Sequence, residues 1–319
     1  MKYLGIDLGA TNIAVGVVDE DFSVISRLTC KTAIPRAEEK ICDDMARLTK
    51  QALSLVNATL DDIPWIGIGC PGSVNIETGI VEYSANLFFH NWNLAEMMKE
   101  RLFKQIFLEN DANTAAYGEH IAGATKGSKT SITITVGTGI GSGIIIDDKL
   151  YSGCNFTGGE LGHTVIISNG LPCACGRKGC WEVYASSRGL VAIVRENLDR
   201  DIEKKSCMWE MIENNHNKIS GRMPFLAMKK GDILAKVALD QYLEYLSCGI
   251  VNAINLFQPE IFCVGGGISR EGETLLGPIR KYVEENRYSK HSKKQTEVRK
   301  AELGDDSGII GAAFLGNFY

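Results

Sequence analysis

The sequence predicts an α/β protein built from two related domains, and two observations support this. Strand-like apolar runs alternate with amphipathic helical stretches along 319 residues, a length that suggests two domains rather than one. In addition, GIDLGATNIAVGVVD (5–19) is echoed by ITVGTGIGSGIIID (134–147). In each, a strand, a Gly/Thr-rich turn and a second strand ending in Asp follow one another. This weak internal repeat predicts a phosphate-facing turn in each half.

In the first half, five short runs have the apolar or alternating pattern of strands. They are residues 3–7, 12–19, 23–30, 65–70 and 105–111. The Gly-rich or acidic turns between the first three predict an antiparallel meander. Apolar residues spaced three or four apart from 36 to 56 predict a helix, and a second helix is expected after Asp111.

The second half is predicted to be mostly helical after a strand pair at 131–147. Helices are expected at 182–199, at about 204–215 and at 232–257. The run EIFCVGGGIS (260–269) predicts a strand whose glycines open onto another helix. SGIIGAAFLGNF, at the end of the chain, predicts a closing helix with small residues on one face.

Composition excludes several classes of protein. Hydrophobic residues make up 45% and charged residues 23%, as in ordinary globular proteins. The net charge of −5 predicts no nucleic-acid partner. Because no apolar run approaches 18 residues and the N-terminus lacks a signal-peptide pattern, no membrane association or secretion is expected. Most of the ten cysteines are scattered singly, which predicts buried thiols in a reducing, cytoplasmic compartment.

The turn between the first two strands contains Asp7, Gly9 and Thr11. Glycine lets a phosphate approach the backbone N–H groups closely. The Asp7 carboxylate could also reach a phosphate-bound Mg²⁺. A plain hairpin turn is the equally weighted alternative for this segment.

Two further glycine clusters have the same character. Gly137, Thr138 and Gly139 begin a turn that strand-type residues follow, so it is a phosphate-facing hairpin rather than a dinucleotide fingerprint. The second cluster surrounds Gly266, between a strand and a helix, where a nucleotide could lie against the backbone. Three such clusters are more than turn formation alone requires.

The segment Glu109-Asn110-Asp111-Ala112-Asn113 follows a predicted strand. Asp111 could simply cap the following helix. It could also act as a general base that accepts the proton of a hydroxyl attacking a γ-phosphate. The two interpretations are compatible.

The segment GHTVIISNGLPCACGRKGCWE (162–182) predicts a metal site. His163, Cys173, Cys175 and Cys180 offer one nitrogen and three sulfur ligands, the closed tetrahedral set of structural Zn²⁺. A closed set leaves no position for a catalytic water, so the metal is expected to shape the loop rather than to react. The alternative is that His163 forms hydrogen bonds near the core and another residue completes the zinc site.

With these motifs in view, the chain resembles the sugar-kinase branch of the ROK family from Asp7 to the C-terminal helix. The most specific likeness is GELGH (159–163) followed by CACGRKGCWE (173–182), and Asn110-Asp111 and Gly137-Thr138-Gly139 match at the expected places. The resemblance implies an actin/hexokinase-like (ribonuclease-H-like) fold of two α/β domains with an interdomain cleft. We expect a smaller domain of residues 1–118 plus about 303–319, and a larger one of 119–302 that carries the zinc loop.

The resemblance also implies transfer of phosphate from ATP to the 6-hydroxyl of a hexose, with glucose expected. By motif match, Asp111 is the base. The residues implied to bind the sugar are Asn86, Asn110, Asp111, Glu160, His163 and Glu182. The residues implied on the ATP and Mg²⁺ side are Asp7, Gly9, Thr11, Gly137, Thr138 and Gly266. The zinc would preorganise the sugar pocket, so metal loss is expected to raise the sugar KM far more than the ATP KM. A homodimer or homotetramer is expected.

Two departures leave the hexose open. Ala85 precedes Asn86 where Pro is usual, and the following FFHNWNL (88–94) is bulkier than expected. Allose, fructose, mannose and an N-acetylhexosamine are the alternative substrates. A sugar-sensing repressor is disfavoured because the chain begins at the first hairpin. A non-catalytic zinc module is disfavoured because Asp7, Asp111 and three glycine turns occur together.

Overall fold

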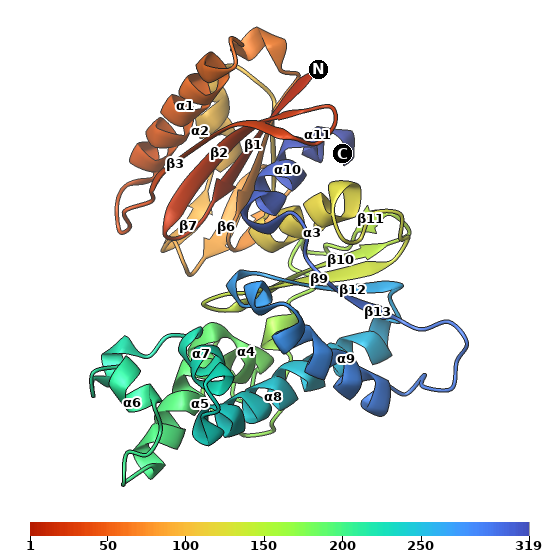
Figure 1. Ribbon diagram of the computed structural model, residues 1–319. Helices are drawn as coiled ribbons and strands as arrows, with labels where there is room; N and C mark the ends of the chain where they lie inside the picture. Colours follow the sequence, from red (N-terminus) through yellow and green to blue (C-terminus); the bar gives the residue numbers. More distant parts are fainter. Residues whose placement is uncertain (319) are drawn as a thin grey trace. The chain divides into compact units, whose positions relative to one another are not determined.

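The computed structural model describes residues 1–318 (Figure 1). The chain divides into two compact units. The first unit comprises residues 1–133, 143–159 and the chain from Glu302 on, and the second comprises residues 134–142 and 160–301. The domain boundaries expected near residues 118 and 303 stay predictions.

A five-stranded sheet organises the first unit, in the order β3-β2-β1-β4-β8. The strands are β1 (Lys2–Leu8), β2 (Asn12–Asp19), β3 (Val24–Lys31), β4 (Ile66–Cys70) and β8 (Ile106–Asn110). The predicted antiparallel meander is confirmed, because β2 pairs antiparallel with both β1 and β3. The strands β1, β4 and β8 run parallel, so their carboxyl ends lie at one edge of the sheet.

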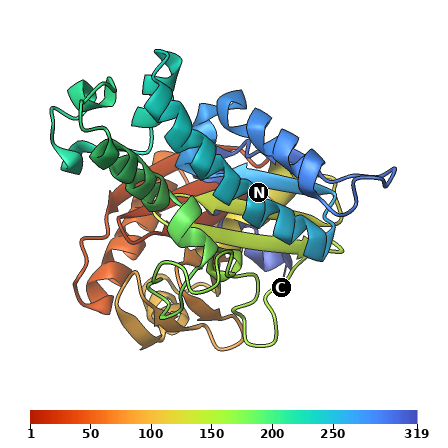
Figure 2. The same ribbon diagram turned by 90° about the horizontal axis from the view of Figure 1, so that it is seen from below.

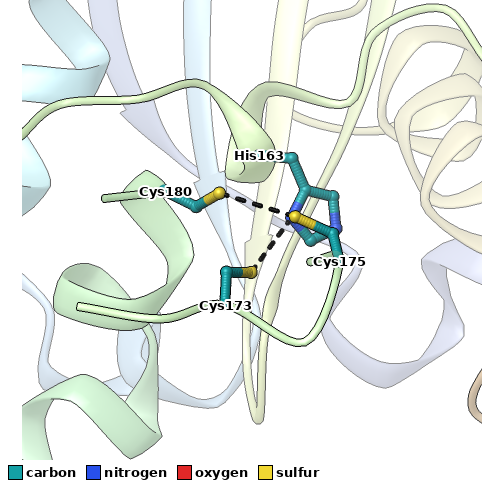
Figure 3. A group of neighbouring side chains, drawn as sticks. All are labelled: His163, Cys173, Cys175 and Cys180. Atoms are coloured by element: carbon teal, nitrogen blue, oxygen red, sulfur yellow. Dashed lines mark hydrogen bonds between the residues drawn. The ribbon is translucent and has the colours of Figure 1, made fainter. Parts of the chain in front are cut away.

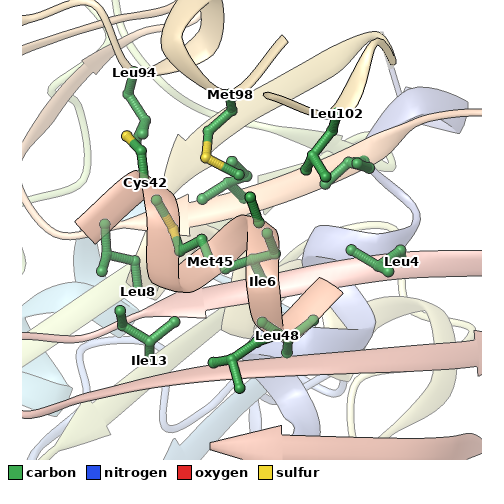
Figure 4. Close-up of a cluster of buried hydrophobic side chains, with 14 of the residues drawn as sticks. Leu4, Ile6, Leu8, Ile13, Cys42, Met45, Leu48, Leu94, Met98 and Leu102 are labelled. Carbon is green, nitrogen blue, oxygen red and sulfur yellow. The ribbon is translucent and has the colours of Figure 1, made fainter. Parts of the chain in front are cut away.

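Helices cover both faces of this sheet because alternate residues of β1 point to opposite sides. Leu4, Ile6 and Leu8 are fully buried in a core with residues of α1 (Glu38–Leu55) and α2 (Leu94–Leu102) (Figure 4). The other face packs against α10 (Ser307–Ala313), α3 (Asp111–Ala122) and the short α11 (Leu315–Phe318). A Cβ at Gly5 would lie only 2.0 Å from the Ile309 carbonyl oxygen of α10. The backbones approach so closely that only glycine fits at this position.

A three-stranded antiparallel sheet in the first unit was not predicted from the sequence. It consists of β5 (Ser73–Asn75), β6 (Ile80–Ser84) and β7 (Phe89–Trp92), paired in that order. These strands are three to five residues long, too short for a period-two pattern to stand out. Its buried apolar residues, Val74, Val81 and Trp92, join the same core as β1.

The second sheet has the order β11-β10-β9-β12-β13. Its strands are β9 (Ser131–Val136), β10 (Ile140–Ile146), β11 (Lys149–Leu150), β12 (Ile261–Gly265) and β13 (Glu297–Lys300). β12 and β13 pair in parallel, whereas β10 and β11 pair antiparallel. The expected strand pair at 131–147 and the strand from Ile261 are therefore confirmed.

The helices of the second unit pack around the 25-residue α8 (Ile233–Phe257), drawn in teal and blue in Figure 2. Its neighbours are α4 (Trp181–Ala185), α5 (Ser187–Arg200), α7 (Met223–Lys229) and α9 (Glu273–Asn286). The helix predicted at 182–199 is confirmed except at Ser186, which is extended, separates α4 from α5 and caps α5 by accepting from the Gly189 N–H. Within residues 1–318, every helix is too short or too polar to cross a bilayer.

The helix predicted at about 204–215, by contrast, is largely absent. Only α6 (Met208–Met211) forms there. Asp201 accepts hydrogen bonds from the Lys205 and Ser206 N–H groups, and Asp232 accepts one from the Cys207 N–H. These carboxylates bind backbone groups that a continuous helix would use itself.

Candidate active site

Asp111, the predicted base, and Asp7, the predicted Mg²⁺ ligand, lie at the same edge of the first sheet. In register, Asp7 of β1 faces Gly69 of β4, which faces Glu109 of β8. Asp111 follows two residues after Glu109, at the first position of α3. Because the three strands are parallel, Asp7 and Asp111 lie at their carboxyl ends, on the two sides of β4. This edge is where ligands of open α/β sheets usually bind.

The surroundings of Asp7 perturb its titration. Burial is the main cause that raises the pKa of Asp7 from 3.8 to about 6, with Arg27 lowering it and Asp305 raising it further. The carboxylate lies against the first turn of α10, where a Cβ at Gly308 would be 3.1 Å from the Asp7 Cγ. A carboxylate placed this way is stabilised by a cation, so Asp7 fits a Mg²⁺ ligand.

The turn between β1 and β2 is supported by a residue that the sequence did not point to. The Gly9 N–H donates to the Asn12 carbonyl at 2.9 Å. Thr32, fully buried just after β3, donates its hydroxyl to the Gly9 carbonyl at 2.6 Å and its N–H to the Thr11 carbonyl at 3.0 Å. Thr11 itself is exposed. Thr32 therefore fixes the turn while Thr11 stays accessible to a ligand.

Asn110, rather than Asp111, caps α3. The Asn110 side chain accepts from the Ala112 and Asn113 N–H groups, and its Nδ2 donates to the Gly72 carbonyl at 3.1 Å. Asp111 accepts from the Ala112 N–H at 2.9 Å. The alternative in which Asp111 provides the cap is thus wrong, and Asp111 is oriented by its place in the first helical turn.

Glu109 is a second supporting residue that sequence reasoning missed. Its side chain is fully buried and accepts from the Asn110 N–H at 2.7 Å and from the Asn113 Nδ2 at 3.0 Å. A glutamate at the end of an apolar strand, with an asparagine four residues later that can donate to it, is the sequence signal that could have indicated this role. Glu109 fixes the backbone from which Asp111 projects.

Asn86 lies in the exposed turn between β6 and β7. The structure brings this hairpin near the end of β8 through Gly72, the residue that accepts from Asn110. A Cβ at Gly72 would be 2.1 Å from the Tyr83 carbonyl oxygen. Within the first unit, the hairpin that carries Asn86 and the strand end that carries Asn110 therefore both contact Gly72.

In the second unit, the four predicted metal ligands come together (Figure 3). Their ligand atoms all lie within 4.8 Å of one another. The Cys173 Sγ is 3.6 Å from the His163 Nδ1, and the Cys175 Sγ is 3.6 Å from the Cys180 Sγ. Ligands about 2.0–2.3 Å from a tetrahedral ion are about 3.5–3.8 Å apart. The group can therefore hold a metal ion, with the His163 Nε2 left to bind another group.

The surrounding loop is built to keep these ligands together. The Cys173 N–H donates to the Arg177 carbonyl at 2.8 Å, and the Trp181 N–H donates to the Thr164 carbonyl at 2.7 Å. Trp181 is fully buried against Gly249 of α8, and its Nε1 donates to the Tyr245 carbonyl at 2.9 Å. Trp181 thus anchors the loop in the core of the second unit.

The other predicted residues of the second unit adjoin this loop. The pKa of Glu160 is raised by burial, lowered by His163 and raised by Glu182, which places the three within electrostatic reach. The Glu182 carboxylate accepts from the Ile140 N–H at 2.9 Å, beside Gly137 and Thr138. Gly266 packs on the end of β9, where a Cβ would lie 2.4 Å from the Val136 carbonyl oxygen. The two predicted sets in this unit are therefore neighbours.

Comparison with known proteins decides the family. Residues 3–317 match the ROK family. The chain belongs to the ROK family. Glucokinase from Thermotoga maritima is 36% identical over 317 residues, covering 99% of this chain and 97% of that protein. Glucokinase from Streptomyces coelicolor is 36% identical over 315 residues, covering 98% and 96%.

A solved structure agrees. The ROK family glucokinase from Streptomyces griseus, in complex with glucose and AMPPNP, has a TM-score of 0.86 and 34% identity, and the match covers 99% of both chains. The predicted α/β, actin/hexokinase-like fold class is therefore confirmed for this ROK protein.

A pair of glycine substitutions tests the metal loop. Gly176 and Gly179 both have positive φ, 87° and 83°, so alanine is strained at either. A Cβ at Gly176 meets nothing within 4 Å, whereas a Cβ at Gly179 would lie 1.7 Å from the Ile167 carbonyl oxygen. We expect Gly179→Ala to cost about 1–3 kcal/mol more and to lose most of its bound metal, with Gly176→Ala retaining it. Thermal unfolding and metal analysis of dialysed protein measure both effects, and equal metal content in the two variants would contradict this geometry.

Proposed function

We propose that this ROK protein is an ATP-dependent hexose kinase that phosphorylates the 6-hydroxyl of glucose. The observation that carries the proposal is the match, over nearly the whole chain, to a glucokinase in complex with glucose and AMPPNP. The placement of Asp111 and Asp7 at one sheet edge supports it, because phosphoryl transfer needs a base for the hydroxyl and a cation site for the phosphates.

Each residue has a role in this proposal. Asp111 accepts the proton of the 6-hydroxyl. Asn86 and Asn110 of the first unit, and Glu160, His163 and Glu182 of the second, bind sugar hydroxyls. A bound sugar would desolvate these polar groups, so an analogue that lacks the matching hydroxyl would leave one of them without a partner and be rejected.

The nucleotide side is assigned to backbone-rich turns. Gly9 and Thr11 in the first unit, with Gly137, Thr138 and Gly266 in the second, present N–H groups to the phosphates. Asp7 would hold Mg²⁺, which neutralises charge on the transferring phosphoryl group when bound. The negative charge of Asp7 is needed for this role, and its pKa of about 6 leaves it mostly ionised at pH 7 and above.

The donor set of His163, Cys173, Cys175 and Cys180 fits Zn²⁺, and we assign it a structural role. Four protein ligands leave no open coordination position. The metal would supply rigidity to the loop that carries Glu182. His163 would bind the metal through Nδ1 and a sugar hydroxyl through Nε2.

A coupled ADP-release assay with Mg-ATP and a panel of hexoses tests the proposal. The panel comprises glucose, mannose, allose, fructose, N-acetylglucosamine and N-acetylmannosamine. We expect glucose to exceed the others at least tenfold in kcat/KM, about 1.4 kcal/mol of discrimination. Preference for another sugar would make the Ala85-Asn86 segment the determinant of a different specificity. No turnover with any sugar would overturn the kinase proposal in favour of a sugar-sensing protein.

A further inference from the structure

The turn that joins β9 and β10 has little support of its own. It contains glycine at positions 137 and 139, and a Cβ at Gly137 would meet nothing within 4 Å. One hydrogen bond within the turn is present, from the Gly137 N–H to the Gly139 carbonyl at 2.9 Å. Because glycine is conformationally free, such a turn needs outside contacts to hold one shape.

Glu182 provides the first of these contacts. Its Oε2 accepts from the Ile140 N–H at 2.9 Å. The same oxygen lies so close to Gly139 that a Cβ there would be 2.2 Å away. Glu182 follows the metal ligand Cys180 by two residues and belongs to α4, which Trp181 anchors in the core. The carboxylate therefore reaches the turn from a rigid base.

The second contact comes from the segment that precedes the metal ligand His163. This segment and the one that follows Cys180 are called the two arms of the metal site. Gly162, which directly precedes His163, packs on the Ile140 carbonyl oxygen, where a Cβ would lie 2.3 Å away. The neighbouring Leu161 N–H donates to the Ser142 hydroxyl at 3.1 Å. Ile140 is thus contacted at its N–H by the segment after Cys180 and at its carbonyl by the segment before His163.

A third contact joins the beginning of the turn to the helix that follows α4. The Ser187 N–H, at the start of α5, donates to the Gly137 carbonyl at 2.9 Å. All of these residues belong to the second unit. A metal ion bound by both His163 and Cys180 would link the two arms that contact the turn. Loss of the metal should therefore let both arms move away from the turn.

We propose that Glu182 is a positioning residue for the 137–140 turn, through which the metal loop orders the nucleotide side of the site as well as the sugar side. The assignment of this turn to ATP rests on the proposed function. The expectation that metal loss would act mainly on the sugar KM is revised accordingly. Loss of the metal should weaken nucleotide binding as well.

Two substitutions at Glu182 separate positioning from other roles. Glutamine keeps an oxygen that can accept from the Ile140 N–H, whereas alanine does not. We expect Glu182→Ala to weaken AMPPNP binding, measured by calorimetry without sugar, by at least fivefold. Glu182→Gln should stay within twofold of the unchanged protein. Nucleotide affinity that is unaffected by alanine, or that is lost equally with glutamine, would overturn the proposal.

Amide hydrogen exchange measures the turn directly and needs no ligand. The Ile140 amide should be protected in the unchanged protein and in Glu182→Gln, and should exchange at least tenfold faster in Glu182→Ala or after zinc chelation. Metal content of each variant shows whether the loop itself has survived. Unchanged exchange in Glu182→Ala with metal retained would overturn the positioning role. Because this readout involves neither ATP nor sugar, it remains decisive even if the hexose panel shows no kinase activity.

Discussion

Replacing Asp111 by Asn should lower kcat for glucose phosphorylation about 10²- to 10⁴-fold, the usual contribution of a general base. Asparagine has the same shape and can still accept from the Ala112 N–H, which Asp111 does at 2.9 Å. It cannot accept the proton of a sugar hydroxyl. The helix cap stays intact because Asn110 provides it. The loss should therefore appear in kcat and not in the fold.

Binding and stability measurements distinguish this result from misfolding. Dissociation constants of Asp111→Asn for glucose and for AMPPNP should change by less than about tenfold, and its Tm and metal content should match the unchanged protein. Asp61→Asn, at an exposed carboxylate in the 3-10 turn at Leu60–Asp62, serves as the control and should keep full activity. If the kcat of Asp111→Asn stayed within a few-fold of that of the unchanged protein, Asp111 would not be the general base.

Replacing Asp7 by Asn should stabilise the ligand-free protein at pH 7.5 and yet abolish turnover. The folded-state pKa of about 6 lies above the ordinary 3.8. Asp7 is therefore protonated in both states below pH 3.8, and its cost to stability develops as the pH rises from 3.8 to about 6 and is complete above that. The difference of about two units between the folded and unfolded pKa values corresponds to a cost of about 3 kcal/mol in stability. The gain should be close to zero at pH 4 and largest above pH 7, as measured by unfolding at both pH values.

Asp232→Asn is the matched control because it should act in the opposite direction. Although burial raises the pKa of Asp232, hydrogen bonds from Ala235, Ser206 and Cys207 lower it overall. Its ionised form therefore stabilises the fold at neutral pH, and this contribution is lost as the pH falls through its lowered pKa. If Asp7→Asn lowered the free energy of unfolding at pH 7.5, as Asp232→Asn should, then the ionised Asp7 carboxylate would not destabilise the ligand-free fold, and this explanation of its raised pKa would be wrong.

Much of the fold could be predicted because its signals are local. The meander of β1–β3, the helix α1 and the long α8 each show their own periodicity. The larger failures depended on contacts outside the segment itself. The helix expected at 204–215 is interrupted because Asp232, more than 20 residues away, binds the Ser206 hydroxyl and the Cys207 N–H. The β5–β7 sheet was missed because its pattern is too short to read without its partners.

The residues of the candidate site show the same contrast between local sequence signals and contacts with distant residues. The metal cluster could be predicted because cysteine and histidine at short spacing leave few alternatives. The supporting groups could not: Thr32 reaches Gly9 across 23 positions, and Glu182 reaches Ile140 across 42. Neither contact has a sequence signal, since threonine and glutamate occur everywhere on protein surfaces. The reacting groups could be predicted from the motifs, whereas the residues that hold them in place can be identified only in the folded structure.

Transfer of phosphate to the 6-hydroxyl of glucose is tested by the position of the phosphate in the product. The protein should be incubated with Mg-ATP and either glucose or 6-deoxyglucose, and the products analysed by phosphorus NMR and ADP release. Glucose should yield a hexose phosphate whose phosphorus couples to the C6 protons, and 6-deoxyglucose should yield no phosphorylated product and no ADP above the rate without sugar. Phosphate on another carbon, or equal ADP release with both sugars, would contradict this prediction.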